Sequence, residues 1–371
     1  MRVEVGPGTR GARRHGIAAA PIVLNRRAAV RPTITGVERY TDELTRRLVA
    51  RDPARYRALA PRRRLRGRAA GQAWEQLGLP LRARALGARL ILSPANLAPL
   101  AWPGNVLVLH DAAAWREPAA FSAAYRTWHG VAELGAARRA QALITVSEFS
   151  RRELAALGLD PEAIHVIPGG ADPRFSPAAA PGDAAVRTAH GLTGRYVLTV
   201  ATADARKNLA ALTPVAAALA EREIELVWAG DTRGYFAGVA ATPGLRVLGY
   251  VCDGDLPALY RGAEAFVLAS RYEGFGLTCV EAMASGTPVV AADRAALPET
   301  CGDAALLADP DDGRALTAAV LAAAAGDPAR RDALRAAGIA RAARFTWERT
   351  AERTDRLLRA LAGDGPVPRG R

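Results

Sequence analysis

Short apolar runs that alternate with helix-like stretches are the feature that most constrains the fold of this 371-residue chain. Such runs are typical of buried parallel strands, which helices cover on both faces. The alternation predicts doubly wound α/β sheets, and the number of runs predicts two of them. The runs are Pro21–Asn25, Arg89–Pro94, Asn105–Asp111, Ala142–Ser147, Ile164–Pro168, Tyr196–Ala201, Glu225–Gly230, Leu245–Tyr250, Ala265–Ser270, Pro288–Asp293 and Ala304–Asp309.

The two sheets are expected to form separate domains. The stretch Pro168–Ala185, PGGADPRFSPAAAPGDAA, has the Pro, Gly and Ala content of a linker. We place the N-terminal domain at residues 21–178, after a flexible extension at 1–20, and the C-terminal domain at 179–345. Residues 346–362 have helical spacing and are expected to pack back on the N-terminal domain, and residues 363–371 are expected to form a tail.

The composition argues against several classes of protein. Fully apolar runs reach only about five to seven residues, against the ~20 that a membrane-spanning helix needs. The basic start of the chain lacks the continuous apolar stretch of a signal peptide. Cys252, Cys279 and Cys301 are far apart and odd in number, so we expect neither a disulfide framework nor a zinc site. A reducing, cytoplasmic location fits this pattern.

Positive charge is concentrated near the start of the chain. Residues 1–90 hold 21 Arg and 6 acidic residues, a net charge of +15, so the remainder carries about −2 of the total of +13. The densest part, Arg55–Arg68, has two interpretations that stay open. It is an ordinary solvated surface, or it faces an anionic partner: a membrane, which would hold the protein peripherally at the inner face, or a lipid-diphosphate-linked acceptor. Nucleic-acid binding is not expected, because this region has no zinc-finger spacing and no basic strand with interleaved aromatic residues.

One basic residue differs from the rest. Lys207 is the only lysine among 50 basic residues. Arginine and lysine are not interchangeable, because an ammonium is a compact point charge whereas a guanidinium is a planar fork. The alternative is that one lysine persists by chance. We interpret Lys207 as a position where a compact charge is required.

The stretch Ser270–Val290, SRYEGFGLTCVEAMASGTPVV, has the chemistry of a ligand site. It follows an apolar run, so it is expected at the carboxyl edge of a sheet, where open α/β sheets bind ligands. A helix that begins near Leu277 would present unpaired N–H groups to a phosphate, and the glycines before it let the backbone approach. Glu273 and Glu281 can accept hydrogen bonds from hydroxyl groups on either side. The pattern predicts a nucleotide-sugar site; the alternative is a glycine turn followed by an acid that the helix dipole stabilises.

The segment EGFGLTCVEAMASGTPVVAAD resembles the E-x7-E signature of the retaining glycosyltransferases of family 4, which have the GT-B fold of two Rossmann-like domains facing across a cleft. The resemblance extends over residues 21–361 and is closest to mannosyltransferase-like enzymes of polysaccharide assembly. The other matching pieces, in family order, are TGVERYTDEL, VLVLHDAAAW, ITVSEFSRREL, IHVIPGGADPRF, VLTVATADARKNL and LGYVCDGDLPALYRGAEAFVLAS.

The resemblance implies a role for each matching residue. Glu273 would contact the hydroxyls of the donor sugar and Glu281 those of the ribose, while Arg206 and Lys207 would bind the diphosphate. The chain has Ala201-Thr202 where some members have Gly-Arg or Gly-Thr, so Arg206 would have to supply the second cation. The backbone that would line the sugar and the phosphate belongs to Gly274, Phe275, Gly276, Leu277 and Thr278.

Residues of the opposite domain are implied as well. The resemblance places His110 near the reacting sugar carbon, with Asp111 orienting it. Gly36 would lie in a loop that faces the diphosphate, and the backbone of Tyr250 and Val251 would border the base. Each also has a simpler explanation: a histidine that ends a strand is often structural, and a glycine often starts a helix.

The mechanism implied by the resemblance is transfer of a hexose, with mannose as the first candidate, and with retention at the anomeric carbon. The donor would be a GDP- or UDP-linked sugar, and the acceptor a hydroxyl of a glycan, a lipid-linked glycan or a small molecule. The departing phosphate oxygen would take the acceptor proton. No cofactor and no metal are expected, because we interpret the DGD of Asp253–Asp255 as a helix cap. Arg39 and Tyr40 are expected to pack or to face the acceptor.

Two other functions stay open: a non-catalytic sugar-nucleotide-binding protein, and another GT-B enzyme such as a sugar-nucleotide epimerase. A nicotinamide-dependent oxidoreductase is not expected, because no GxGxxG follows the first apolar run.

Overall fold

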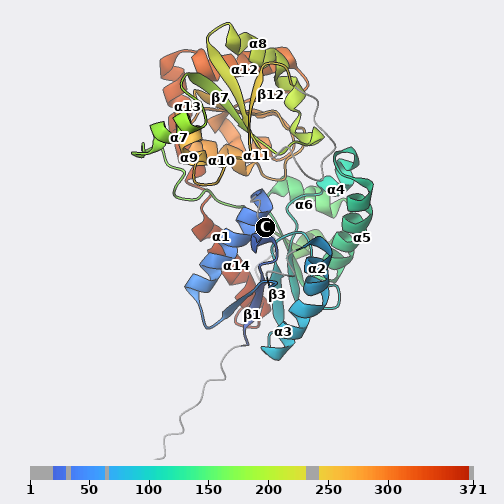
Figure 1. The fold of residues 1–371 in the computed structure, drawn as a ribbon. Coiled ribbons are helices and arrows are strands. Elements are labelled where there is room, and N and C mark those ends of the chain that lie inside the picture. Colours follow the sequence, from blue (N-terminus) through green and yellow to red (C-terminus); the bar gives the residue numbers. More distant parts are fainter. Residues whose placement is uncertain (1–19, 31–34, 63–66, 231–241, 367–371) are drawn as a thin grey trace, which may run out of the picture.

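The computed structural model describes residues 20–30, 35–62, 67–230 and 242–366. Within these ranges the chain forms two six-stranded parallel sheets, one in each lobe of the molecule (Figure 1). The strands are β1 Ile22–Asn25, β2 Tyr56–Leu59, β3 Leu90–Ser93, β4 Asn105–Val108, β5 Ala142–Thr145, β6 Ile164–Val166, β7 Arg195–Val200, β8 Ile224–Ala229, β9 Leu245–Gly249, β10 Ala265–Leu268, β11 Val289–Ala292 and β12 Ala305–Ala308.

Each sheet reverses its direction of growth once. The strand order is β2-β1-β3-β4-β5-β6 in the N-terminal sheet and β12-β11-β10-β7-β8-β9 in the C-terminal sheet. The reversal lies between β1 and β3 in the first sheet and between β7 and β10 in the second. At such a point the loops that follow the two central strands diverge and open a crevice beyond their carboxyl ends. The prediction of two doubly wound α/β sheets is confirmed.

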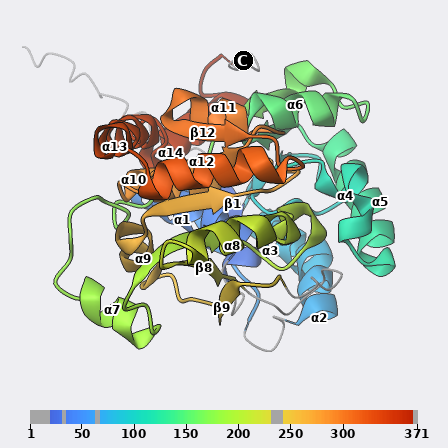
Figure 2. The same ribbon diagram turned by 90° about the horizontal axis from the view of Figure 1, so that it is seen from above.

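Helices cover both faces of each sheet. One core cluster joins α1 and α14 to the N-terminal sheet, whose other face packs against α3, α5 and α6. In the C-terminal sheet α8 and α12 share one face, as Figure 2 shows from above, and α9 and α10 cover the other. The helices of the described ranges are α1 Gly36–Arg51, α2 Arg68–Ala73, α3 Leu79–Ala85, α4 Ala113–Arg116, α5 Ala123–Arg139, α6 Glu148–Ala155, α7 Asp183–Ala189, α8 Thr213–Ala220, α9 Leu256–Gly262, α10 Leu277–Ala284, α11 Leu297–Cys301, α12 Gly313–Ala325, α13 Pro328–Ala342 and α14 Trp347–Leu361.

The last helix returns to the N-terminal lobe. α14, red in Figure 1, lies beside α1. Trp347 at its start is fully buried and its ring meets the edge of Tyr40 at a centroid distance of 5.4 Å. The hydroxyl of Thr350 donates to the carbonyl of Pro168 at 2.7 Å. The chain therefore crosses between the lobes twice, once through the linker and once before α14.

The basic segment Arg55–Arg68 begins with a buried arginine and an edge strand. It contains the edge strand β2, which no apolar run marks because Arg57 and Ala58 on this strand are exposed. Arg55 is 5% exposed and pairs with Asp364 at 2.6 Å, so it is not part of a basic surface. Residues 63–66 and the side chain of Arg68 lie outside the described residues, as do residues 1–19 of the predicted extension and 367–371 of the predicted tail. Among the helices of the described ranges, none combines the length and the apolar character needed to cross a membrane.

Candidate active site

A cavity of about 450 Å³ lies where the carboxyl edges of the two sheets face each other. Both lobes contribute to its wall, and its size suits a small-molecule ligand. Of the thirteen residues predicted for the site, twelve line it, and Glu273 instead contacts one of the twelve, Lys207. The twelve are Gly36, His110, Arg206, Lys207, Tyr250, Val251, Gly274, Phe275, Gly276, Leu277, Thr278 and Glu281.

The loops that follow β7 and β10 bring the lone lysine and the first glutamate together. These two strands are neighbours at the reversal point of the C-terminal sheet, so both loops open into the same crevice. The Nζ atom of Lys207 lies 2.7 Å from Oε1 of Glu273, and the two side chains are 14% and 13% exposed. The carboxylate thereby holds the ammonium at the cavity wall, where an anionic ligand can reach it.

Arg206 is fixed by the turn that carries Lys207. Asp204 begins this 3-10 turn, and its Oδ1 accepts hydrogen bonds from the backbone N of Arg206 at 3.0 Å and from its Nε at 3.1 Å. The guanidinium also lies over the ring of Phe121, 5.3 Å from the centroid. Burial lowers the pKa of Arg206, but nearby carboxylates, Asp204 foremost, raise it further, so the pKa stays above its ordinary value. Arg206 is therefore a permanent positive charge at the cavity.

The glycine loop before α10 contacts both lobes. Gly276 has a φ of +89°, a left-handed conformation that favours glycine, and a Cβ there would come within 2.5 Å of Leu297. α10 begins directly afterwards, where the sequence places it. The carbonyl of Gly274 accepts hydrogen bonds from the hydroxyls of Ser147 at 2.6 Å and Ser150 at 3.1 Å, both in the N-terminal lobe. The first N–H groups of α10 have no intrahelical acceptor, so the loop presents them to the cavity as an anion site.

Glu281 is held from two sides in the wall of the cavity. Its Oε1 accepts from Arg39 of the N-terminal lobe, and its Oε2 from the hydroxyl of Tyr260 at 3.3 Å. Arg39 also pairs with Asp253 at 2.6 Å. Burial raises the pKa of Glu281, and Arg39 opposes that shift. A carboxylate has about four lone-pair sites, so one on each oxygen stays available to a ligand hydroxyl.

His110 enters the cavity from the end of β4. Its Nε2 lies 2.9 Å from the carbonyl of Pro94, which assigns the ring proton to Nε2 and leaves Nδ1 as an acceptor. Tyr40 meets the ring edge-on at a centroid distance of 4.8 Å. Burial is the main cause of a lowered pKa, so the ring is neutral at pH 7. Asp111 was predicted to orient the ring, but its carboxylate accepts from the backbone N of Ala113 at 2.8 Å.

Three further expectations need correction. Gly36 is the first residue of α1 rather than a loop residue, and a Cβ there would meet no atom within 4 Å. Arg39 does not merely pack, because it binds Glu281. Asp255 does not cap α9 with its side chain but lies 2.9 Å from Nε2 of His190, and Asp253 binds Arg39. In the described ranges no three His, Cys, Asp or Glu side chains gather in a way that would hold a metal ion.

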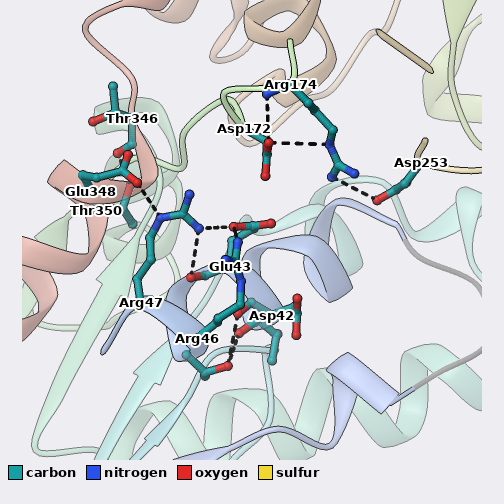
Figure 3. A network of polar contacts seen from close by, with 12 residues as sticks. Asp42, Glu43, Arg46, Arg47, Asp172, Arg174, Asp253, Thr346, Glu348 and Thr350 are labelled. Atoms are coloured by element: carbon teal, nitrogen blue, oxygen red, sulfur yellow. Dashed lines mark hydrogen bonds and ion pairs between the residues drawn. The ribbon is translucent and has the colours of Figure 1, made fainter. Parts of the chain in front are cut away.

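Polar contacts also fasten the linker between the lobes (Figure 3). Arg174 in the linker lies 3.7 Å from Asp172 and reaches Asp253 of the C-terminal lobe at 3.5 Å. On the other side of the same network Arg47 of α1 pairs with Glu348 of α14 at 2.9 Å. Asp253 thus connects Arg39 in the site to the linker, so the position of the lobes and the ionic contacts around Glu281 are coupled.

Several residues that hold the site were not predicted. Ser147 ends an apolar run and Ser150 follows three residues later, at the same sheet edge as His110, so the rule that located His110 would have located both serines as well. No local pattern identifies Arg39 as the partner of Glu281, because the two lie 242 residues apart. The residues in question are Arg39, Ser147, Ser150, Asp253 and Tyr260.

Comparisons with known proteins agree with this architecture. The family described as glycosyl transferases group 1 matches residues 194–325, and the family described as Glycosyltransferase Family 4 matches residues 34–175. The O-antigen chain mannosyltransferase B of Escherichia coli is 45% identical over 117 residues, which are 32% of this chain and 30% of that protein. The MMP alpha-(1->4)-mannosyltransferase of Mycolicibacterium hassiacum is 33% identical over 256 residues, 65% of this chain and 58% of that protein. The chain thus spans less than two thirds of these relatives.

Solved structures show the same fold. Sucrose-phosphate synthase from Thermosynechococcus elongatus superposes with a TM-score of 0.73 at 21% identity, over 93% of this chain and 100% of that chain. Anabaena HepE, solved in complex with UDP-glucose, superposes with a TM-score of 0.68 at 20% identity, over 90% of this chain and 98% of that chain. With both domains matched in order and the two sheets in place, the chain belongs to the family 4 glycosyltransferases of the GT-B fold.

Proposed function

We propose that the protein is a retaining glycosyltransferase that moves a hexose from a nucleoside diphosphate sugar to a hydroxyl of an acceptor. The observation that carries the proposal is the ion pair of Lys207 with Glu273 beside the open end of α10, at the reversal point of the C-terminal sheet. This arrangement combines cations for a diphosphate with a carboxylate for sugar hydroxyls.

The donor is expected to lie along the wall of the cavity. Its diphosphate would contact Lys207, Arg206 and the first N–H groups of α10, and its ribose would donate to the free lone pairs of Glu281. The base would then lie toward Tyr250 and Val251, of which Tyr250 is 40% exposed and Val251 is buried. The sugar would occupy the space between the glycine loop and His110.

The proposed reaction breaks the bond between the anomeric carbon and the phosphate oxygen and forms one between that carbon and the acceptor oxygen on the same face. The acceptor proton passes to the departing phosphate oxygen. Lys207 and Arg206 stabilise the charge that develops on the diphosphate, and α10 adds its dipole. His110 and Glu273 position the sugar. We propose that these cations serve without a metal ion.

Mannose is the first candidate for the sugar, because relatives of the chain are named mannosyltransferases, the two described above among them. HepE, which shares the fold, was solved with UDP-glucose. The nucleotide of the donor is accordingly expected to be GDP or UDP, and the binding experiment below distinguishes the two.

The acceptor is expected to approach from the N-terminal lobe. Contact with an anionic membrane through Arg55–Arg68 would depend, among its described arginine side chains, on the exposed Arg57 and Arg62. Flotation with anionic and neutral liposomes tests this contact, and equal weak binding to both would contradict it.

The proposal is tested by a nucleotide panel followed by a transfer assay. Calorimetry with GDP, UDP, dTDP and ADP on the wild type and on Glu281→Ala identifies the base; a ligand at 100 times its Kd stabilises by roughly 2.7 kcal/mol. NMR of the product formed from the matching hexose donor then reports the anomer. Nucleotide binding with neither sugar transfer nor hydrolysis of the donor would favour a non-catalytic sugar-nucleotide-binding protein. A product with the inverted anomeric configuration would refute retention.

A further inference from the structure

A second cavity, of about 340 Å³, lies behind the glycine loop. It shares Val146, Gly169 and Phe275 with the first cavity but contains none of the predicted donor-site cations. The ring of Phe275, which lines both cavities, meets the ring of Phe345, which lines the second, at a centroid distance of 5.4 Å. The wall comes from both lobes and from the crossover into α14.

Four arginines line this cavity. They come from the end of α13, the turn after it and the first two turns of α14, so they lie close together in sequence as well as in space. Glu299 is the one acidic side chain among the described residues of the wall. The arginines are Arg341, Arg344, Arg349 and Arg353.

None of these guanidinium groups forms an ion pair with a carboxylate in the described part of the chain, although Asp303 and Glu299 lie near enough to Arg341 to favour its charged form. Their hydrogen bonds go to backbone carbonyls: Arg341 to Thr300 at 2.9 Å and Arg353 to Val166 at 2.8 Å are examples. The carboxylate of Glu299 accepts instead from the backbone N atoms at the start of α6, at 2.7 and 2.9 Å. Carbonyl contacts orient an arginine without balancing its charge, so the cavity is strongly positive.

The charges repel one another, which gives an anion a reason to bind. Burial first, and then the neighbouring Arg344, lower the pKa of Arg341. Arg344 and Arg349 are exposed, so a ligand can reach them. The planar fork of a guanidinium matches two oxygens of a phosphate, and clusters of arginine are typical of sites for phosphorylated ligands.

We infer that this cavity binds a phosphate or diphosphate group through Arg341, Arg344, Arg349 and Arg353, at a site separate from the proposed donor site. Its volume accommodates a phosphorylated small molecule. The same chemistry is found in a lipid headgroup. A bound anion would link the crossover into α14 to the back of the glycine loop through the Phe345–Phe275 contact.

The test uses pyrophosphate as the probe and removes the other cationic site first. In the full-length protein with Arg206→Gln and Lys207→Ala, which lacks both cations of the proposed donor site, calorimetry at fixed ionic strength should still show one saturable pyrophosphate site. Adding Arg344→Gln and Arg349→Gln should raise its Kd at least tenfold. A matched control adds Arg314→Gln and Arg330→Gln, two exposed arginines that line neither cavity, and should leave the Kd unchanged.

Circular dichroism and thermal unfolding of each variant without ligand confirm that the fold persists. No saturable binding in the protein with Arg206→Gln and Lys207→Ala, or equal weakening in both sets of variants, would overturn the inference. Vesicles with phosphatidic acid and with phosphatidylcholine alone identify the source. Arginine-dependent binding to the former assigns a lipid headgroup; pyrophosphate binding without vesicle binding assigns a free phosphorylated molecule.

Discussion

Removal of Arg39 is expected to destabilise the protein chiefly by leaving Glu281 without its counter-charge. Arg39 and Glu281 are buried side chains, 9% and 1% exposed. Breaking a buried ion pair by removing one partner costs about 3–5 kcal/mol. Glu281 keeps the hydroxyl of Tyr260 at 3.3 Å, so we expect Arg39→Met to lie near the lower end, about 3 kcal/mol at pH 8.

Neutralising the acidic partner, Glu281, should destabilise the protein less than removing Arg39. Glu281→Gln leaves Arg39 paired with Asp253 at 2.6 Å, so it loses a charge-assisted hydrogen bond and no buried charge is left alone. We expect about 1.5–3 kcal/mol for that loss. The double variant Arg39→Met, Glu281→Gln should be more stable than Arg39→Met by at least about 1 kcal/mol, because it removes the unpaired charge.

The pH dependence has a definite sign. In Arg39→Met, burial raises the pKa of Glu281 with no arginine to oppose it, so the folded state favours the protonated acid. The favourable protonated form is fully present below the unfolded pKa of about 4.3 and is lost as pH rises through the higher folded pKa. The stability gap to the wild type should therefore widen between pH 5 and pH 8.

Urea unfolding, followed by both tryptophan fluorescence and circular dichroism, measures these differences in the free energy of unfolding. The transitions seen by the two probes must coincide for a two-state treatment. Double-variant stability equal to or below that of Arg39→Met at pH 8, or a gap that narrows with rising pH, would refute the reasoning.

Three other changes test the remaining structure. Lys207→Ala should lower kcat by about 10²–10³-fold if its charge stabilises the leaving diphosphate, and Lys207→Arg should restore part of it; equal rates for Ala and wild type would contradict the role. Gly276→Ala should cost about 1–2 kcal/mol for its left-handed conformation, in addition to the contact with Leu297, whereas Gly365→Ala, where a Cβ meets no atom within 4 Å, should be near neutral in thermal unfolding. Trp347→Ala should lower the free energy of unfolding in urea by about 3–5 kcal/mol, because the side chain is fully buried where the start of α14 packs on the N-terminal lobe.

The strands that could be predicted are those buried on both faces. An apolar run marks β10, for example, because every residue of AFVL is buried. β2 lies at the edge of its sheet, where Tyr56 alone is buried and Arg57 faces solvent, so its sequence carries no such run. Its pairing with β1 makes this segment a strand although its own sequence does not indicate one.

The site was predictable to the extent that it lies on loops after strands. Lys207 and Glu273 follow apolar runs, and parallel strands bring such loops to one edge of a sheet. The orientation of side chains was not predictable in the same way. Asp111 contacts the start of the following helix α4 rather than His110, and Asp255 contacts His190 rather than capping α9 with its side chain. A short acidic side chain can satisfy several nearby donors equally well.

Arg39 connects the two lobes at Glu281, the carboxylate that we propose to bind the ribose of the donor. It reaches from α1 of the N-terminal lobe to Glu281 and Asp253 of the C-terminal lobe. A change in the angle between the lobes that lengthens the contact of Arg39 with Glu281 leaves the buried carboxylate of Glu281 without that counter-charge. A ligand hydroxyl that donates to Glu281 reduces that penalty, because it satisfies lone pairs that Arg39 leaves free. If Glu281 binds the ribose as proposed, nucleotide binding and the relative position of the lobes are linked through this carboxylate, whose Oε1 contacts Arg39 of the N-terminal lobe and whose Oε2 contacts Tyr260 of the C-terminal lobe.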